Sequence, residues 1–155
     1  MEDISYINTP IGNLKIHTCF NFLHKIEFIN NDLPKKVSKI SSLAKQVKLE
    51  INEYFNGTRR RFKIPIKLNL PPFYKRVLLE VRRIEYGYVN SYFEIAKRVE
   101  NQKATRAVGT ANAKNPIPII IPCHRVILSN QKIGKYSGGI EKKGFLLKHE
   151  RINIF

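Results

Sequence analysis

The chain has 155 residues, 43% of them hydrophobic, and its 28 lysines and arginines outnumber 12 aspartates and glutamates to give a formal charge of +16. That length allows one domain or two small ones, and that hydrophobic content excludes a disordered chain. The charge favours binding to a polyanion, either nucleic acid or an anionic membrane surface. No apolar run reaches the roughly 20 residues of a membrane-spanning helix, and the opening Met-Glu-Asp is unlike a signal peptide. We therefore expect a cytoplasmic protein with no membrane partner.

The beginning of the chain is rich in residues that favour strands. The segments ISYINT (4–9), NLKIHTC (13–19) and KIEFIN (25–30) each predict a short strand. Turn residues lie between these segments: Pro10, Gly12 and Asn21.

A helix and one more strand are expected next. Apolar residues recur with helical spacing from about Ser42 to Asn56, where Gly57 ends the pattern. Apolar residues then alternate through 61–70, which predicts a strand, and Pro65 places that strand at a sheet edge. These elements predict an N-terminal domain of sheet plus helix over residues 1–70.

Helical patterns fill residues 71–155, the expected C-terminal domain. An apolar face from Phe73 to Ile84 predicts a first helix. Ser91 and Glu94 form a capping box that opens a second helix, ending near Val99.

A third helix is expected from about Ala104 to Ala113, directly after a short turn. Two short helices joined by such a turn are typical of the helix-turn-helix motif. The basic excess is larger here, with 16 basic and 6 acidic residues over 71–155 against 12 and 6 over 1–70.

The third helix, within KATRAVGTANAK, consists almost entirely of small residues, with Arg106 as the long side chain in its middle. Readers of the major groove offer long polar side chains to the bases, whereas small residues let a backbone approach the narrower minor groove, about 6 Å wide. On such a surface Arg106 could enter the base stack. The alternative is that the small residues pack one helix against another and leave Arg106 exposed.

The segment IPIIIPCHRVI places Cys123, His124 and Arg125 after an apolar run, 119–121, that we interpret as a buried strand. A free thiol has a pKa of about 8.5, so a nearby base or positive charge is needed to raise its thiolate fraction. His124 and Arg125 are candidates for that role, and Glu150 could orient the imidazole. The alternative is a buried structural cysteine. The two cysteines, Cys19 and Cys123, could pair, but two are too few for a disulfide framework, and we expect free thiols in a reducing cytosol.

Three stretches in this order, NPIPIIIPCHRVI, GKYSGG and FLLKHE, resemble the active-site signature of the O6-alkylguanine-DNA alkyltransferases. RAVGTAN is similar to the recognition helix of that family. The resemblance covers about Phe73 to Glu150 and extends through TPIGNLKI into the N-terminal half. It implies an α+β chain in two parts: a ribonuclease H-like N-terminal domain, and a helical C-terminal domain with a helix-turn-helix.

The resemblance implies a single irreversible transfer of the alkyl group from O6 of a flipped-out guanine to Cys123. His124 would act through water as the base, and Glu150 would hold the imidazole. Asn115 resembles the asparagine that braces the active-site turn. Tyr92 resembles the tyrosine that rotates the phosphate and donates a hydrogen bond as guanine leaves.

The same resemblance assigns binding roles. Tyr136 and Ser137 would line the base pocket, while the carbonyls of Cys123 and Val126 would accept from the guanine amine. Arg106 would fill the gap left by the flipped base. Residues expected at the DNA backbone are Tyr92, Asn101 and Ser129.

This sequence departs from the family pattern at two positions of the recognition helix. Asn112 stands where an apolar residue is common, and Thr110 where a second glycine is common.

Some members bind zinc in the N-terminal domain, but only Cys19 and His24 keep the spacing of such ligands. We therefore expect no metal and no cofactor, and a monomer whose partner is double-stranded DNA.

Other classes of protein explain less of the sequence. A cysteine hydrolase would use Cys123 and His124 but has no need of the charge or the paired helices. A transcription regulator would explain the helices and the charge but not CHR beside YSGG. A binding-only relative would lack the reactive cysteine.

Overall fold

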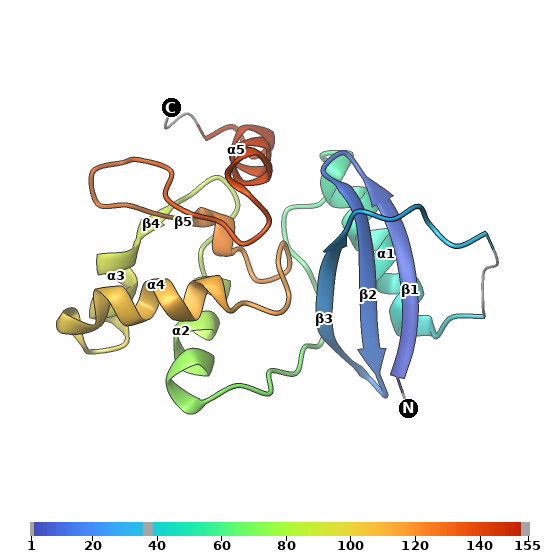
Figure 1. The fold of residues 1–155 in the computed structure, drawn as a ribbon, viewed down its shortest axis with the longest axis horizontal. Helices are drawn as coiled ribbons and strands as arrows, with labels where there is room; N and C mark the ends of the chain where they lie inside the picture. Colours follow the sequence, from blue (N-terminus) through green and yellow to red (C-terminus); the bar gives the residue numbers. More distant parts are fainter. Residues whose placement is uncertain (1, 36–38, 153–155) are drawn as a thin grey trace. The chain divides into compact units, whose positions relative to one another are not determined.

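The structure is a computed structural model that describes residues 2–35 and 39–152. The chain divides into two compact units, Met1–Leu68 and Asn69–Phe155. Figure 1 shows strands and one long helix in the first unit, and shorter helices in the second.

The first unit is built on a three-stranded antiparallel sheet of order β1-β2-β3. Strands β1 (Glu2–Thr9), β2 (Gly12–Cys19) and β3 (Phe22–Ile29) confirm the three predicted segments. Leu14 and Ile16 of the central strand are fully buried, because alternate residues of β2 face the helix that covers the sheet.

That helix, α1 (Ser42–Phe55), confirms the predicted helix. The Ser41 hydroxyl accepts from the Ala44 amide at 3.1 Å and satisfies one of the free N–H groups of the first turn. Val47, Ile51 and Tyr54 on one face are fully buried, so amphipathic spacing fixes which side of α1 lies against the sheet.

The strand predicted over 61–70 is wrong. The segment makes a single parallel bridge, between Ile66 and Leu23 of β3. The Leu23 amide donates to the Pro65 carbonyl at 2.9 Å and the Lys67 amide donates to the Leu23 carbonyl at 3.0 Å. Pro65 has no amide hydrogen with which to extend a ladder. The alternation itself is real, because Ile64 and Leu68 are buried.

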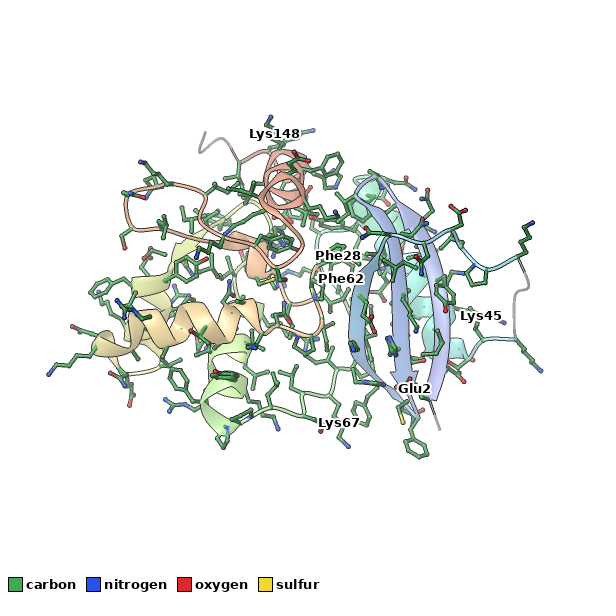
Figure 2. The ribbon with its side chains drawn as sticks, in the orientation of Figure 1. Glu2, Phe28, Lys45, Phe62, Lys67 and Lys148 are labelled. Atoms are coloured by element: carbon green, nitrogen blue, oxygen red, sulfur yellow. The ribbon has the colours of Figure 1, made fainter. Side chains whose placement is uncertain are left out.

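A network of histidines and glutamates crosses one end of the sheet. His17 on β2 is buried and contacts Glu2 at 3.1 Å and Glu27 at 2.7 Å. His24 on β3 contacts the second oxygen of Glu2 at 2.9 Å. Figure 2 labels Glu2 near the start of β1, at this end. Because these histidines bind carboxylates on neighbouring strands, they act as cross-strand contacts within the first unit.

The second unit contains α2 (Pro72–Arg82), α3 (Tyr92–Arg98), α4 (Thr105–Ala113) and α5 (Ile140–His149). Two short 3-10 helices, η1 (Gln102–Ala104) and η2 (Cys123–Arg125), and a parallel pair of short strands, β4 (Asn90–Ser91) and β5 (Val126–Ile127), complete it. Helix α4 packs against both α2 and α3 (Figure 1). The three helices predicted before residue 114 are confirmed.

The start of α3 shows why the capping-box prediction was correct. The Glu94 amide donates to the Ser91 hydroxyl, and the Ser91 amide donates to the Glu94 carboxylate, both at 3.0 Å. This box fixes where α3 begins, and therefore fixes Tyr92, its first residue. In the described part of the chain, no helix combines the length and apolar character needed to cross a membrane.

Candidate active site

The buried strand predicted over 119–121 is wrong, because residues 117–121 form a tight turn built around one side chain. Asn115 donates from Nδ2 to the Ile121 carbonyl at 2.9 Å and accepts from the Ile117 amide at 3.0 Å. Ile119 has φ 75, a conformation that β-branched residues rarely adopt. The prolines at 116, 118 and 122 have no backbone N–H, so three of the hydrogen bonds that a β-strand would donate cannot form. The buried isoleucines and Asn115 together hold this strained turn, which leads directly into η2.

Cys123 is the first residue of η2 and is 2% exposed. No disulfide joins Cys123 to Cys19, as expected. Burial raises the pKa of Cys123, and the side chains of Asn115 and Tyr136 and the charge of Lys143 oppose this only in part. The cysteine is therefore held chiefly as a thiol, and a base must take its proton when it reacts.

His124 and Arg125, the next two residues, both bind the same carboxylate. His124 Nε2 lies 2.7 Å from Glu150 Oε2, and both side chains are fully buried. Arg125 donates to the two oxygens of Glu150 at 2.7 and 3.0 Å, and to the Ile84 carbonyl at 2.6 Å. Arg125 is thus committed to Glu150, which corrects the expectation that it could stabilise a Cys123 thiolate.

These contacts define the tautomer of the imidazole. Burial raises the pKa of Glu150, but His124 and Arg125 outweigh burial and hold it well below its ordinary range, so Glu150 is ionised. An ionised carboxylate only accepts hydrogen bonds, so His124 Nε2 carries the proton. Burial lowers the pKa of His124, against the effect of Glu150, and keeps the ring neutral. Nδ1 then presents a lone pair, and this buried atom has no hydrogen-bond partner among the described residues.

Lys143 on α5 is a component of the site that the sequence analysis missed. Its ammonium group is fully buried and donates to the carbonyls of Val126 at 2.7 Å and Lys135 at 3.0 Å. Burial lowers the pKa of Lys143 to about 8, against the opposing effect of Cys123. A signal was present in the sequence, because Lys143 lies seven residues before Glu150, two turns along the same helix.

Tyr92, at the start of α3, lies against several parts of the site. Its ring centroid is 5.9 Å from the Lys143 nitrogen. A Cβ added to Gly134, which has φ 74, would lie 3.4 Å from the Tyr92 hydroxyl. Burial raises the pKa of Tyr92, Cys123 raises it further, and the side chain of Asn112 lowers it. The phenol is therefore a neutral O–H donor at neutral pH, close to the thiol.

The remaining predicted site residues divide into two groups. Val126 is fully buried on β5, and Tyr136 is half-buried with a pKa raised well above its ordinary value by burial and by Cys123. These two therefore lie with the thiol. The other four are exposed side chains on loops or on α4: Asn101, Arg106, Ser129 and Ser137.

Comparison with known protein families covers both units. Residues 4–68 match the ribonuclease-like domain of 6-O-methylguanine DNA methyltransferase, and residues 72–152 match the DNA-binding domain of the same protein. The methylated-DNA–protein-cysteine methyltransferase of Methanosarcina acetivorans is 36% identical over 149 residues, 96% of this chain and 86% of that protein. The protein of the same name from Haemophilus influenzae is 37% identical over 154 residues, again 96% and 86%.

Solved structures of proteins from the same family have a similar fold. The crystal structure of Mycobacterium tuberculosis OGT in complex with DNA matches with a TM-score of 0.85 and 34% identity, over 94% of this chain and 91% of that chain. O6-methylguanine-DNA methyltransferase from Pyrococcus kodakaraensis matches with a TM-score of 0.65 and 27% identity, over 98% and 100%. Sequence and fold therefore agree over both units, and the chain belongs to the O6-methylguanine DNA methyltransferase family.

Proposed function

We propose that the protein repairs O6-alkylguanine, chiefly O6-methylguanine, in double-stranded DNA by moving the alkyl group irreversibly to its own Cys123. Its relatives are named methylated-DNA–protein-cysteine methyltransferases, which supports this reaction. One observation carries the proposal: a buried thiol is followed by a neutral histidine whose Nε2 is fixed by Glu150 and whose Nδ1 has no hydrogen-bond partner among the residues that the structure describes. That arrangement suits a nucleophile that loses its proton only on reaction.

The transfer is a single displacement at carbon. The Cys123 proton passes through a water molecule to His124 Nδ1, and Glu150 stabilises the imidazolium that forms. The sulfur then attacks the alkyl carbon, a carbon–sulfur bond forms and the bond from carbon to O6 breaks. The electron pair stays with the departing guanine, which takes up a proton. Tyr92, a neutral O–H donor beside the thiol, supplies a hydrogen bond to this leaving group.

The base pocket uses the groups around the thiol. Tyr136 and Ser137 line it, with Ser137 near O6. The Val126 carbonyl accepts from the guanine 2-amino group, and Lys143 fixes the direction of that carbonyl. Asn115 holds the turn that presents Cys123 to the pocket.

DNA binds at α3 and α4, which act as a helix-turn-helix in the minor groove. The target carbon is out of reach inside a duplex, so the base must be flipped out at a cost of a few kcal/mol. Arg106, exposed on α4, enters the stack and recovers part of that cost. Asn101 and Ser129, also exposed, contact the backbone. The net charge supplies affinity for any sequence, and the protein works as a cytoplasmic monomer without a cofactor.

The test is a titration of excess DNA containing O6-methylguanine against a known amount of protein, read by intact mass and by peptide mapping. We expect one methyl group per molecule, on Cys123, because a thioether does not hydrolyse as a thioester does. Cys123→Ala should be inactive, while Cys19→Ala, which removes the other cysteine, should react fully. More than one methyl removed per protein, as a turning-over cysteine hydrolase would give, would overturn the proposal. So would modification of another residue.

A further inference from the structure

The segment that follows α1 in the first unit carries a row of basic side chains. Residues 59–67 contain five lysines and arginines, and no aspartate or glutamate occurs from residue 54 to residue 79. Four of the five are exposed, and we call them the basic row: Arg60, Arg61, Lys63 and Lys67. Like charges so close together repel one another, and a bound polyanion would relieve that repulsion.

The segment is extended, so its side chains alternate between the interior and the solvent. Ile64 and Leu68 are buried, and the bridge from Ile66 to β3 attaches the segment to the edge of the sheet. Lys63 and Lys67 therefore project outward on the same side. Six steps of about 3.3 Å separate residues 61 and 67, which makes the row about 20 Å long.

Contacts to the backbone hold the segment in place and leave the side chains of the row outside. The Lys63 amide donates to Glu50 Oε1 at 2.8 Å, and Gln46 Nε2 donates to the Lys63 carbonyl at 3.1 Å. Arg59 donates from its guanidinium to the Arg61 carbonyl at 2.7 Å. The row is thus presented by a fixed backbone, and a ligand that binds it does not have to order that backbone first.

The carboxylates of α1 do not neutralise the row. The Arg59 guanidinium, the fifth cation of the segment, lies 3.2 Å from a Glu53 oxygen and 3.4 Å from a Glu50 oxygen. Glu50 is 3% exposed, so its charge is matched by Arg59 inside the unit. The positive charge of the row therefore faces the solvent.

The chemistry and the length of the row suit the backbone of duplex DNA. Each strand of B-DNA carries one phosphate per 3.4 Å of helix axis, so about six phosphates of one strand lie along 20 Å. Lysine and arginine bind phosphates whatever the base sequence. Peripheral membrane segments bury apolar side chains in the lipid, but Ile64 and Leu68 face inward here, so the segment is a poor match for a membrane surface.

We propose that the basic row is a second DNA-binding surface, which lies on the first unit and binds the phosphate backbone of duplex DNA. This inference rests on the proposed function, which assigns DNA contacts to residues of the second unit alone. The row takes no part in alkyl transfer. It adds affinity that is independent of sequence and is weakened by salt.

The experiment measures how the binding constant for a long undamaged duplex depends on salt in the double variant Lys63→Gln, Lys67→Gln. Each phosphate contact contributes about 0.9 to the slope of log binding constant against log salt concentration. The slope of the double variant should therefore be smaller in magnitude by about 1.8 than that of the wild type. Transfer from a free O6-alkylguanine base involves no DNA, so its rate should stay at the wild-type value and show that the protein is folded.

The matched control is the double variant Lys35→Gln, Lys45→Gln, which removes the same charge from exposed positions of the first unit. Figure 2 labels Lys67 near β3 and Lys45 beyond β1, at opposite edges of the sheet. The control should keep the wild-type slope. A wild-type slope in Lys63→Gln, Lys67→Gln, or an equal decrease in both double variants, would overturn the inference. Failure of the proposed function would look different, since methylated duplex would then leave Cys123 of the wild type unmodified.

Discussion

Replacing Glu150 with glutamine should impair both folding and alkyl transfer, because an amide cannot satisfy all the donors that this carboxylate binds. Glu150 Oε1 accepts from Arg125, and Oε2 accepts from Arg125 and from His124. If the amide nitrogen replaces Oε1, it faces an Arg125 N–H. If it replaces Oε2, it again faces an Arg125 N–H and also forces His124 into the opposite tautomer.

The structure sets the size of both effects. Glu150 and Arg125 are buried, and breaking a buried ion pair by removing one charge costs about 3–5 kcal/mol. The melting temperature should therefore fall by roughly 6–20 °C, at about 2–4 °C per kcal/mol for a chain of this size. The proton carried by Nε2 in the wild type would move to Nδ1 in the flipped tautomer, so the base would lose its lone pair. General-base catalysis contributes about 10²–10⁴-fold, and we expect a rate loss in that range.

The pH dependence of stability gives a second readout. The pKa of Glu150 is held well below its ordinary value of 4.5. A depressed carboxyl contributes stability that is complete above its unfolded pKa and is lost as the pH falls toward its folded pKa. The wild type should thus lose stability below about pH 5 relative to Glu150→Gln, and the gap between their melting temperatures should narrow there.

The assays are thermal denaturation from pH 3 to 8 and rapid-quench single-turnover transfer at pH 7, at a temperature where both proteins are folded. Glu141→Gln is the control, because Glu141 is exposed on the same helix, and it should behave as wild type in both. A Glu150→Gln protein with the melting temperature of the wild type and a rate within about threefold of it would refute the reasoning.

Three further predictions concern Arg106, Lys143 and the overall charge. Arg106→Ala should slow transfer from duplex DNA far more than transfer from a free O6-alkylguanine base, which needs no flipping; equal slowing of both would assign Arg106 another role. The pKa of Lys143 is about 8 in the folded protein, below its ordinary 10.5. Between about pH 8 and 10.5 the unfolded chain therefore binds one proton more than the folded protein does, so the free energy of unfolding should rise with pH across that range. Lys143→Met should lack this rise in thermal denaturation, and a parallel pH profile in both proteins would contradict the assignment. Affinity for undamaged duplexes should fall steeply with salt and vary little with sequence, whereas a strong preference for one undamaged sequence in titrations would argue against charge-driven binding.

The local elements could be predicted from the sequence because their signals are local. Ser41 and the capping box of Ser91 and Glu94 fix helix starts through hydrogen bonds that span three residues. The two wrong strand predictions also have local causes. Three prolines and the side chain of Asn115 place the predicted strand 119–121 in a turn, and Pro65 limits 61–70 to one bridge. Apolar content predicts burial in both segments, but it does not distinguish a buried strand from a buried turn.

The motif around Cys123 was enough to propose the nucleophile and its histidine, since these residues are neighbours in the chain. The sequence could not show which charged side chain binds which partner in the site. Arg125 binds Glu150, 25 residues away, and Lys143 reaches the Val126 carbonyl from α5. Asn112, which looked like a departure from the family pattern, donates to the Cys123 carbonyl. Such pairings depend on how the helices pack, because a side chain's partner is whatever the fold brings within about 3 Å, and only the tertiary structure determines that distance.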